Sequence, residues 1–232
     1  MNCNEACDLA AIDWPSWLTA VGTISLAILA VFQDKIRAFL LKPKLTVSIS
    51  TNSPDSVKTP MQAGQVVGDA YWFRLRIGNE GNTSANNIEV LAQRLFRRNA
   101  DNTFTEDVNF QPMNLLWAHF KTPFLEAISP STFKFCDVGF IPDPARFAAM
   151  YPTSNPAISV VKTALFLETV VKPFNSSNVL PPGFYRLSVV VAANNAKPIT
   201  ATIEINHTGD WHADTARMSK EGIGLTVSIG SK

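Results

Sequence analysis

The run of residues from Trp14 to Phe32 constrains this chain more than any other feature, because it contains no charged residue. The hydrocarbon core of a bilayer is about 30 Å thick and is crossed by roughly 20 mostly apolar residues in a helix. Large apolar side chains recur on all sides of the helix axis here, whereas a helix buried in a soluble protein usually keeps a polar stripe. The run therefore predicts a helix that spans a membrane.

The flanks of this run favour a retained anchor over a cleaved signal peptide. The preceding tail contains Glu5, Asp8 and Asp13 but no Lys or Arg, whereas a signal peptide begins with positive charge and ends in a small-residue cleavage site. Asp13 is placed to cap the helix, and helical spacing continues until Pro43 ends it. We expect one transmembrane and interfacial helix over residues 13–42.

Basic residues follow the span and none precede it. They are Lys35, Arg37, Lys42 and Lys44. Because positive flanks stay in the cytoplasm, we expect a single-pass protein of the cell inner membrane with residues 1–12 as a short extracytoplasmic tail. Residues 43–232 would then form a cytoplasmic domain, and the four basic side chains would be candidates for contact with anionic lipid headgroups.

One face of the predicted span carries small residues. Thr19, Thr23 and Ala27 recur at every fourth position, which places them on the same side of a helix. Faces of this kind let two helices approach closely, so a homo-oligomer formed through the span is one interpretation. Small residues are also common in membrane spans generally, so a helix that serves only as a tether stays open as the other.

After Pro43 the hydrophobic period changes from helical to alternating, which is typical of half-buried strands. We expect strands near residues 45–49, 71–77, 88–96, 133–138, 187–191, 199–205 and 225–229. Residues 160–171 form a near-continuous apolar run, which indicates a central strand. Residues 52–68, which contain Pro54 and Pro60, are expected to form a loop, and Asp143 is expected to cap a short helix over residues 145–150.

Two motifs resemble parts of bacterial immunoglobulin-like or fibronectin-like sandwich domains. The first runs from Ile77-Gly78-Asn79-Glu80-Gly81 to Ala85 and the strand at Ile88, and the second places Pro182-Gly183 before Tyr185. The second is similar to the tyrosine corner that opens a late strand in such domains. The chain is also similar to small bacterial membrane proteins with one N-terminal span and a β-domain. The resemblance implies a mainly β fold, in which one N-terminal transmembrane helix precedes an elaborated Ig-like antiparallel β-sandwich; it implies no functional residue.

Groups capable of chemistry are sparse. His207, Asp210 and His212 lack further ligands at a recognised spacing, and they fit a polar loop better than a metal site. Cys136 lies among apolar residues, which favours a buried thiol over a nucleophile. Cys3 and Cys7 would lie outside the cytoplasm, as idle thiols or as a link between chains. Arg94, Arg97 and Arg98 indicate either a solvated strand end or a contact with anionic lipid or phosphate.

Composition and motifs together narrow the function. A formal net charge of +1 provides no basic footprint for nucleic acid, and no nucleophile–base pair or cofactor motif is recognisable. We therefore expect no enzyme and no cofactor or metal. The leading hypothesis is a membrane-anchored interaction module that presents a β-sandwich to a protein partner in the cytoplasm. The alternative is a signal-gated oligomeric membrane effector, for example in anti-phage defence, whose β-domain senses a ligand or partner.

Overall fold

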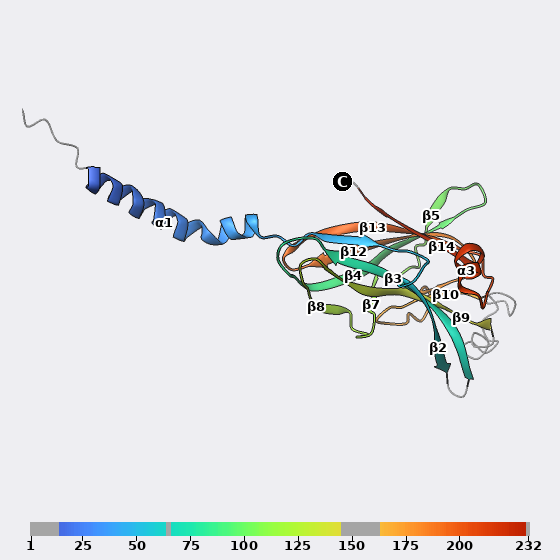
Figure 1. Ribbon diagram of the computed structural model, residues 1–232. Helices are drawn as coiled ribbons and strands as arrows, with labels where there is room; N and C mark the ends of the chain where they lie inside the picture. The colour runs from blue at the N-terminus through green and yellow to red at the C-terminus, as the bar shows by residue number, and fades with distance from the viewer. Residues whose placement is uncertain (1–13, 64–65, 145–162, 231–232) are drawn as a thin grey trace, which may run out of the picture. The chain divides into compact units, whose positions relative to one another are not determined.

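The computed structural model describes residues 14–63, 66–144 and 163–230 (Figure 1). It divides the chain into two compact units, Met1–Lys42 and Pro43–Lys232. The first contains helix α1 (Trp14–Leu40), which ends just before Pro43, as the sequence predicts. The expected cap at Asp13 and the expected helix over residues 145–150 lie outside the described residues.

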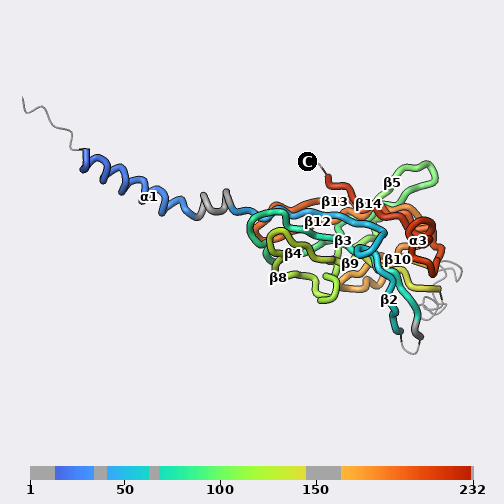
Figure 2. The backbone as a smooth tube through the Cα atoms, viewed as in Figure 1, coloured from blue at the N-terminus to red at the C-terminus, as the bar shows by residue number. Residues whose placement is uncertain are grey.

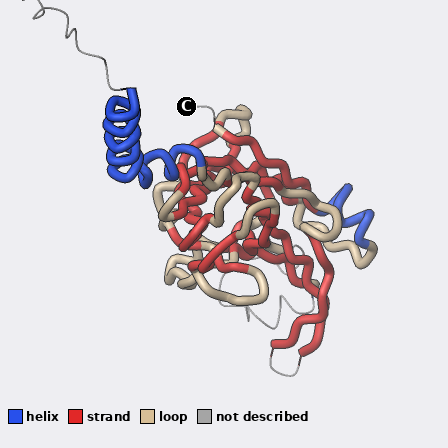
Figure 3. Tube along the Cα trace, turned by 60° about the vertical axis from the view of Figure 1, so that its left-hand side comes forward, coloured by secondary structure: helices blue, strands red, loops and turns tan. Residues whose placement is uncertain are grey.

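The second unit is an antiparallel β-sandwich of two sheets, which confirms the predicted fold class (Figure 1). Sheet A contains β1 (Leu45–Ser48), β2 (Ser56–Ala63), β3 (Val66–Asn79), β7 (Leu116–Trp117), β9 (Thr132–Pro142), β10 (Leu165–Leu167) and β11 (Val179–Leu180). Sheet B contains β4 (Ala85–Arg98), β5 (Phe104–Glu106), β6 (Met113–Asn114), β8 (Phe124–Ile128), β12 (Gly183–Ala193), β13 (Ala196–His207) and β14 (Ile223–Ile229). A short helix, α3 (Thr215–Arg217), and the π-helical turn η1 (Met218–Gly222) precede β14. Strands make up most of this unit (Figure 3).

The core lies between the two sheets and is built from alternate residues of the strands. In β3 the inward residues are Tyr71, Phe73, Leu75 and Ile77, and in β12 they are Tyr185, Leu187, Val189 and Val191. All eight are at most 2% exposed and belong to one apolar cluster. Burying such a side chain contributes about 1.5–3 kcal/mol. The alternation in the sequence predicts this core correctly.

The C-terminal strands follow one another in space as they do in the sequence (Figure 2). β12 and β13 pair through a tight turn at Asn194-Asn195, and β14 then pairs with β13. The sequence predicts all three strands. They could be predicted because each covers the core with one face only, so that its apolar residues alternate with polar ones.

The N-x-G motif at Asn79 connects the two sheets. β3, which precedes it, lies in sheet A, whereas β4, which follows it, lies in sheet B. β3 is paired instead with β1 and β2 along one side and with β9 along the other. The motif is therefore an arch across the sandwich and not the turn of a hairpin.

One sequence expectation is wrong, and a second is confirmed as a central strand that is shorter than expected. Residues 52–68 do not form a loop, because β2 pairs with β3 from Ser56↔Phe73 to Ala63↔Val66. Pro60 lies within β2. Proline usually indicates a loop, but an edge strand tolerates a residue that has no backbone N–H. In the apolar run 160–171, the described strand is only Leu165–Leu167. This run is apolar because Leu165 and Leu167 enter the main core while Phe166 packs in a second cluster on the other face of sheet A.

Candidate functional site

Helix α1 exposes its apolar side chains. Every residue from Trp14 to Gln33 is exposed, and this 20-residue segment has a mean hydropathy of 1.7. In the described part of the chain it is the one helix long and apolar enough to cross a membrane, judged by length and composition. In water such a surface would be unfavourable by about 25 cal/mol per Å² of apolar area.

The hydroxyl groups on the small face of α1 are satisfied inside the helix. Thr19 Oγ1 donates to the Pro15 carbonyl and Thr23 Oγ1 to the Thr19 carbonyl, both at 2.8 Å. Bonds to a carbonyl one turn earlier remove the cost of placing a hydroxyl in hydrocarbon. The face of Thr19, Thr23 and Ala27 is therefore small and presents no unsatisfied hydroxyl to a lipid chain or to another helix.

The four basic residues after the span belong to two units, with Lys35, Arg37 and Lys42 in the first and Lys44 in the second. Lys35 and Arg37 lie in the last turns of α1, where side chains are outside the described part, and Lys42 is exposed. Lys44 belongs to the sandwich unit, and its Nζ lies 3.0 Å from Glu80 Oε2 in an exposed ion pair. Such pairs contribute about 0–1 kcal/mol, so Glu80 holds Lys44 only weakly.

Both motifs that carry the family resemblance have structural roles. Asn79 is 1% exposed; its Oδ1 accepts hydrogen bonds from the backbone N–H groups of Lys44 and Gly81, and its Nδ2 donates to the carbonyls of Thr83 and Ile128. Tyr185 Oη donates to the Pro181 carbonyl at 2.7 Å, which is the hydrogen bond of a tyrosine corner. These hydrogen bonds hold the sandwich together.

Two neighbouring loops of the sandwich expose apolar side chains, which we together call the loop patch. Its members are Val108 (89% exposed), Val170 (47%), Val171 (61%) and Phe174 (107%). The loops are joined where Asn175 Nδ2 donates to the Asn109 carbonyl at 2.9 Å and where the N–H of Val170 donates to the Asn114 carbonyl at 3.0 Å.

Exposed apolar side chains on neighbouring loops make this region a candidate interaction surface. Sequence reasoning missed the loop patch because Val170 and Val171 continue an apolar run that it assigned to a buried strand. The available signal was Pro173, a residue typical of loops, next to Phe174.

The three arginines of β4 each contact a neighbouring side chain of the sandwich. Arg94 forms a bidentate ion pair with Glu106, and the hydrogen bond from Arg94 lowers the pKa of the Glu106 carboxyl. Arg97 donates to Tyr185 Oη at 3.1 Å, and the Arg98 guanidinium lies 3.3 Å from the centre of the Phe184 ring. This agrees with a solvated strand end, and none of these contacts requires a phosphate or a lipid.

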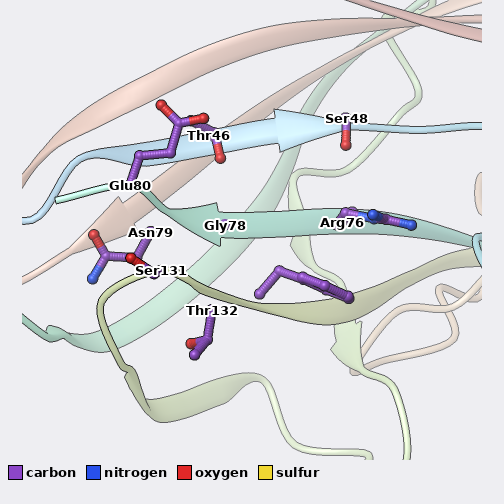
Figure 4. Close-up of a pocket in the computed structure, with 9 residues that line it drawn as sticks. Thr46, Ser48, Arg76, Gly78, Asn79, Glu80, Ser131 and Thr132 are labelled. Atoms are coloured by element: carbon purple, nitrogen blue, oxygen red, sulfur yellow. The ribbon is translucent and has the colours of Figure 1, made fainter.

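A shallow hollow lies on the outer face of sheet A, where β1, β3 and β9 run side by side (Figure 4). Its volume is about 450 Å³, and Thr46, Ser48, Arg76 and Phe133 are among the residues that line it. Arg76 is already engaged, because its Nη2 lies 2.6 Å from Asp55 Oδ1 and its guanidinium 4.5 Å from the Phe133 ring centre. The hollow therefore offers hydroxyls but no uncompensated charge.

Cys136 and His207 are both buried parts of the fold. Burial, followed by the charge of Asp137, raises the pKa of the Cys136 thiol well above its ordinary value, which disfavours the nucleophilic thiolate. His207 is 1% exposed; its Nε2 lies 3.1 Å from the Thr163 carbonyl, and its Nδ1 accepts from the N–H of Gly209. Within the described ranges, no group of three or more His, Cys, Asp or Glu side chains could hold a metal ion.

Comparisons with protein-family models, with curated proteins and with solved structures found no match. The family resemblance drawn from the two motifs therefore stays a prediction. The exposed surface of α1 and the loop patch are the candidate functional sites, and both are made of apolar side chains.

Proposed function

We propose that this chain is a membrane-anchored, non-enzymatic interaction module. In this proposal α1 is inserted in the cell inner membrane, and the sandwich lies in the cytoplasm, where it binds a protein partner. The observation that carries the proposal is the pair of exposed apolar surfaces, one over α1 and one at the loop patch. The first fits a lipid bilayer, and the second fits a partner protein.

The chemistry of the loop patch supports a protein partner. Phe174 is fully exposed on a loop that also carries Val170 and Val171. Aromatic side chains of this kind are enriched at protein interfaces. Asn175 and Asn109 hold the two loops together, so less conformational entropy is lost when a partner binds.

Site-specific photo-crosslinking of the full-length chain in membranes tests this function. A photoreactive phenylalanine analogue at Phe174 should give a discrete product of higher mass with a partner protein. The matched control is the same analogue at Phe124, which is 56% exposed but lies in β8, outside the loop patch. Equal labelling at the two positions would contradict binding through the loop patch.

The second candidate function is a signal-gated oligomeric membrane effector. It is favoured by the small face of α1, where the hydroxyls of Thr19 and Thr23 are satisfied within the helix and leave a surface suited to close helix contact. Induced expression of the chain should then depolarise the cells, as followed with a potential-sensitive dye. An interaction module without effector activity should leave the membrane potential unchanged.

A further inference from the structure

Strand β14 forms an open edge of sheet B. In the part of the chain that the structure describes, its only strand partner is β13. Seven consecutive residue pairs, from Ala201↔Ile229 to His207↔Ile223, join the two strands without a register shift. A regular edge of this kind presents a row of backbone groups to which another strand can pair.

The phase of the ladder identifies these backbone groups. Gly230 N–H donates to the Thr200 carbonyl at 3.1 Å, and Thr208 N–H donates to the Gly222 carbonyl at 3.0 Å. Hydrogen-bonded pairs recur at every second residue of an antiparallel ladder, so the even-numbered residues of β14 are bonded to β13. The N–H and C=O groups of Leu225, Val227 and Ile229 therefore point toward the open edge.

β14 lacks the features that protect other edges of this sandwich. β5 and β8 contain Glu106 and Glu126, and β2 contains Lys58 and Pro60. β1, β6 and β11 have four residues or fewer. β14 has seven residues, with no charge and no proline. Charges, prolines and short length are the usual means by which proteins prevent pairing at a sheet edge.

The side chains of β14 become less covered along the strand. Leu225 is 6% exposed and packs in the core, whereas Ile229 on the same face is 57% exposed. Thr226 and Ser228 lie on the other, solvent-facing side of the strand. A strand added at this edge would cover Ile229 and pair with the free backbone groups together.

We propose that β14 pairs antiparallel with β14 of a second copy of this chain, centred on Val227, so that the two B sheets become one continuous sheet. In this register Val227 faces its own counterpart, Leu225 faces Ile229, and Thr226 faces Ser228. A two-fold contact must be complementary to itself, and this one matches apolar with apolar and hydroxyl with hydroxyl without like charges. The inference concerns an edge separate from the loop patch and does not rest on the proposed function.

Disulfide crosslinking of the full-length chain in membranes tests the pairing. Cα atoms of a hydrogen-bonded antiparallel pair lie about 5.5 Å apart, within the range of a disulfide. In a chain carrying Cys3→Ser and Cys7→Ser, Val227→Cys should shift under mild oxidation to twice the monomer mass on a non-reducing gel. The control is Glu204→Cys, an exposed position on the adjacent strand β13. If Val227→Cys dimerises no more than Glu204→Cys, the proposal is wrong.

A second experiment tests the register and the backbone pairing. Co-expressed copies with Thr226→Cys and Ser228→Cys should crosslink with each other more strongly than either does with itself. Adding Val227→Pro to both copies should abolish this product, because proline removes an N–H that the second copy needs and β13 does not use. Crosslinking that survives Val227→Pro would overturn pairing through the β14 backbone.

Discussion

Single buried polar groups determine how the two sheets are connected, and Asn79 is the clearest case. Its amide makes four hydrogen bonds, to backbone groups at the start of β1, in the arch after β3 and at the end of β8. A buried amide is costly unless its hydrogen-bonding capacity is used, and here all of it is used. The side chain therefore substitutes for strand pairing at a position where the chain leaves one sheet for the other.

The change Asn79→Ala is expected to destabilise the sandwich, because it leaves the N–H groups of Lys44 and Gly81 and the carbonyls of Thr83 and Ile128 without this partner. A buried polar group left unsatisfied costs about 1–3 kcal/mol. The measurement is the free energy of unfolding of the full-length chain in detergent.

The matched control for that change is Asn99→Ala, because the Asn99 amide also bonds two partners, Thr103 and Thr105, but in an exposed turn. It should change stability by no more than about 0.5 kcal/mol, as is usual for surface substitutions. Equal losses for the two variants would show that Asn79 has no special role.

Among the secondary-structure elements, the sequence predicts strands well where only one face is buried. β12, β13 and β14 alternate clearly because each has core residues on one side and water on the other. The sequence does not predict β2, because Pro60 is a residue typical of loops. It predicts too long a strand at β10, because residues on both faces of this strand are buried and the apolar run therefore shows no alternation. The loop patch was missed for a related reason, since an exposed apolar loop and a buried strand have the same composition.

The register of β12 leads to a prediction about stability. Leu187 is fully buried between the sheets, so Leu187→Ala should lower the free energy of unfolding by about 2–5 kcal/mol. The control is Ser188→Ala on the outer face of the same strand, which should have little effect. A thermal midpoint that does not move with Leu187→Ala would contradict this register.

The small face of α1 predicts that one substitution can weaken contact between helices without preventing membrane insertion. Thr23→Leu adds bulk to the face of Thr19, Thr23 and Ala27 without making the helix less apolar, so membrane insertion should survive while contact between helices falls. The measurement is crosslinking of the full-length chain in membranes, and Ile28→Leu is the control on another side of the helix. Crosslinking that is unchanged by Thr23→Leu would leave α1 as a tether only.

At the scale of the whole molecule, charge near the apolar segment is expected to decide which compartment the sandwich occupies. Four basic residues, Lys35, Arg37, Lys42 and Lys44, follow the apolar segment, and the tail before it contains only acidic charges. This asymmetry can be found in the sequence because orientation depends on local charge and not on the fold. A partner for the loop patch could not be predicted in this way, because exposed apolar side chains do not specify the chemistry of what they bind.

The orientation prediction can be tested with a reporter that is active only outside the cytoplasm, fused after Lys232. The fusion should stay inactive, because the basic flank is expected to hold the sandwich in the cytoplasm. Moving the charge should reverse the result: Lys35, Arg37 and Lys42 changed to Gln, together with Glu5→Lys and Asp8→Lys, should activate the reporter. These changes leave the apolar segment and the sandwich core intact, so a change in signal reports orientation and not folding. An active reporter on the unaltered chain would place the loop patch outside the cytoplasm and require its partner to be sought there.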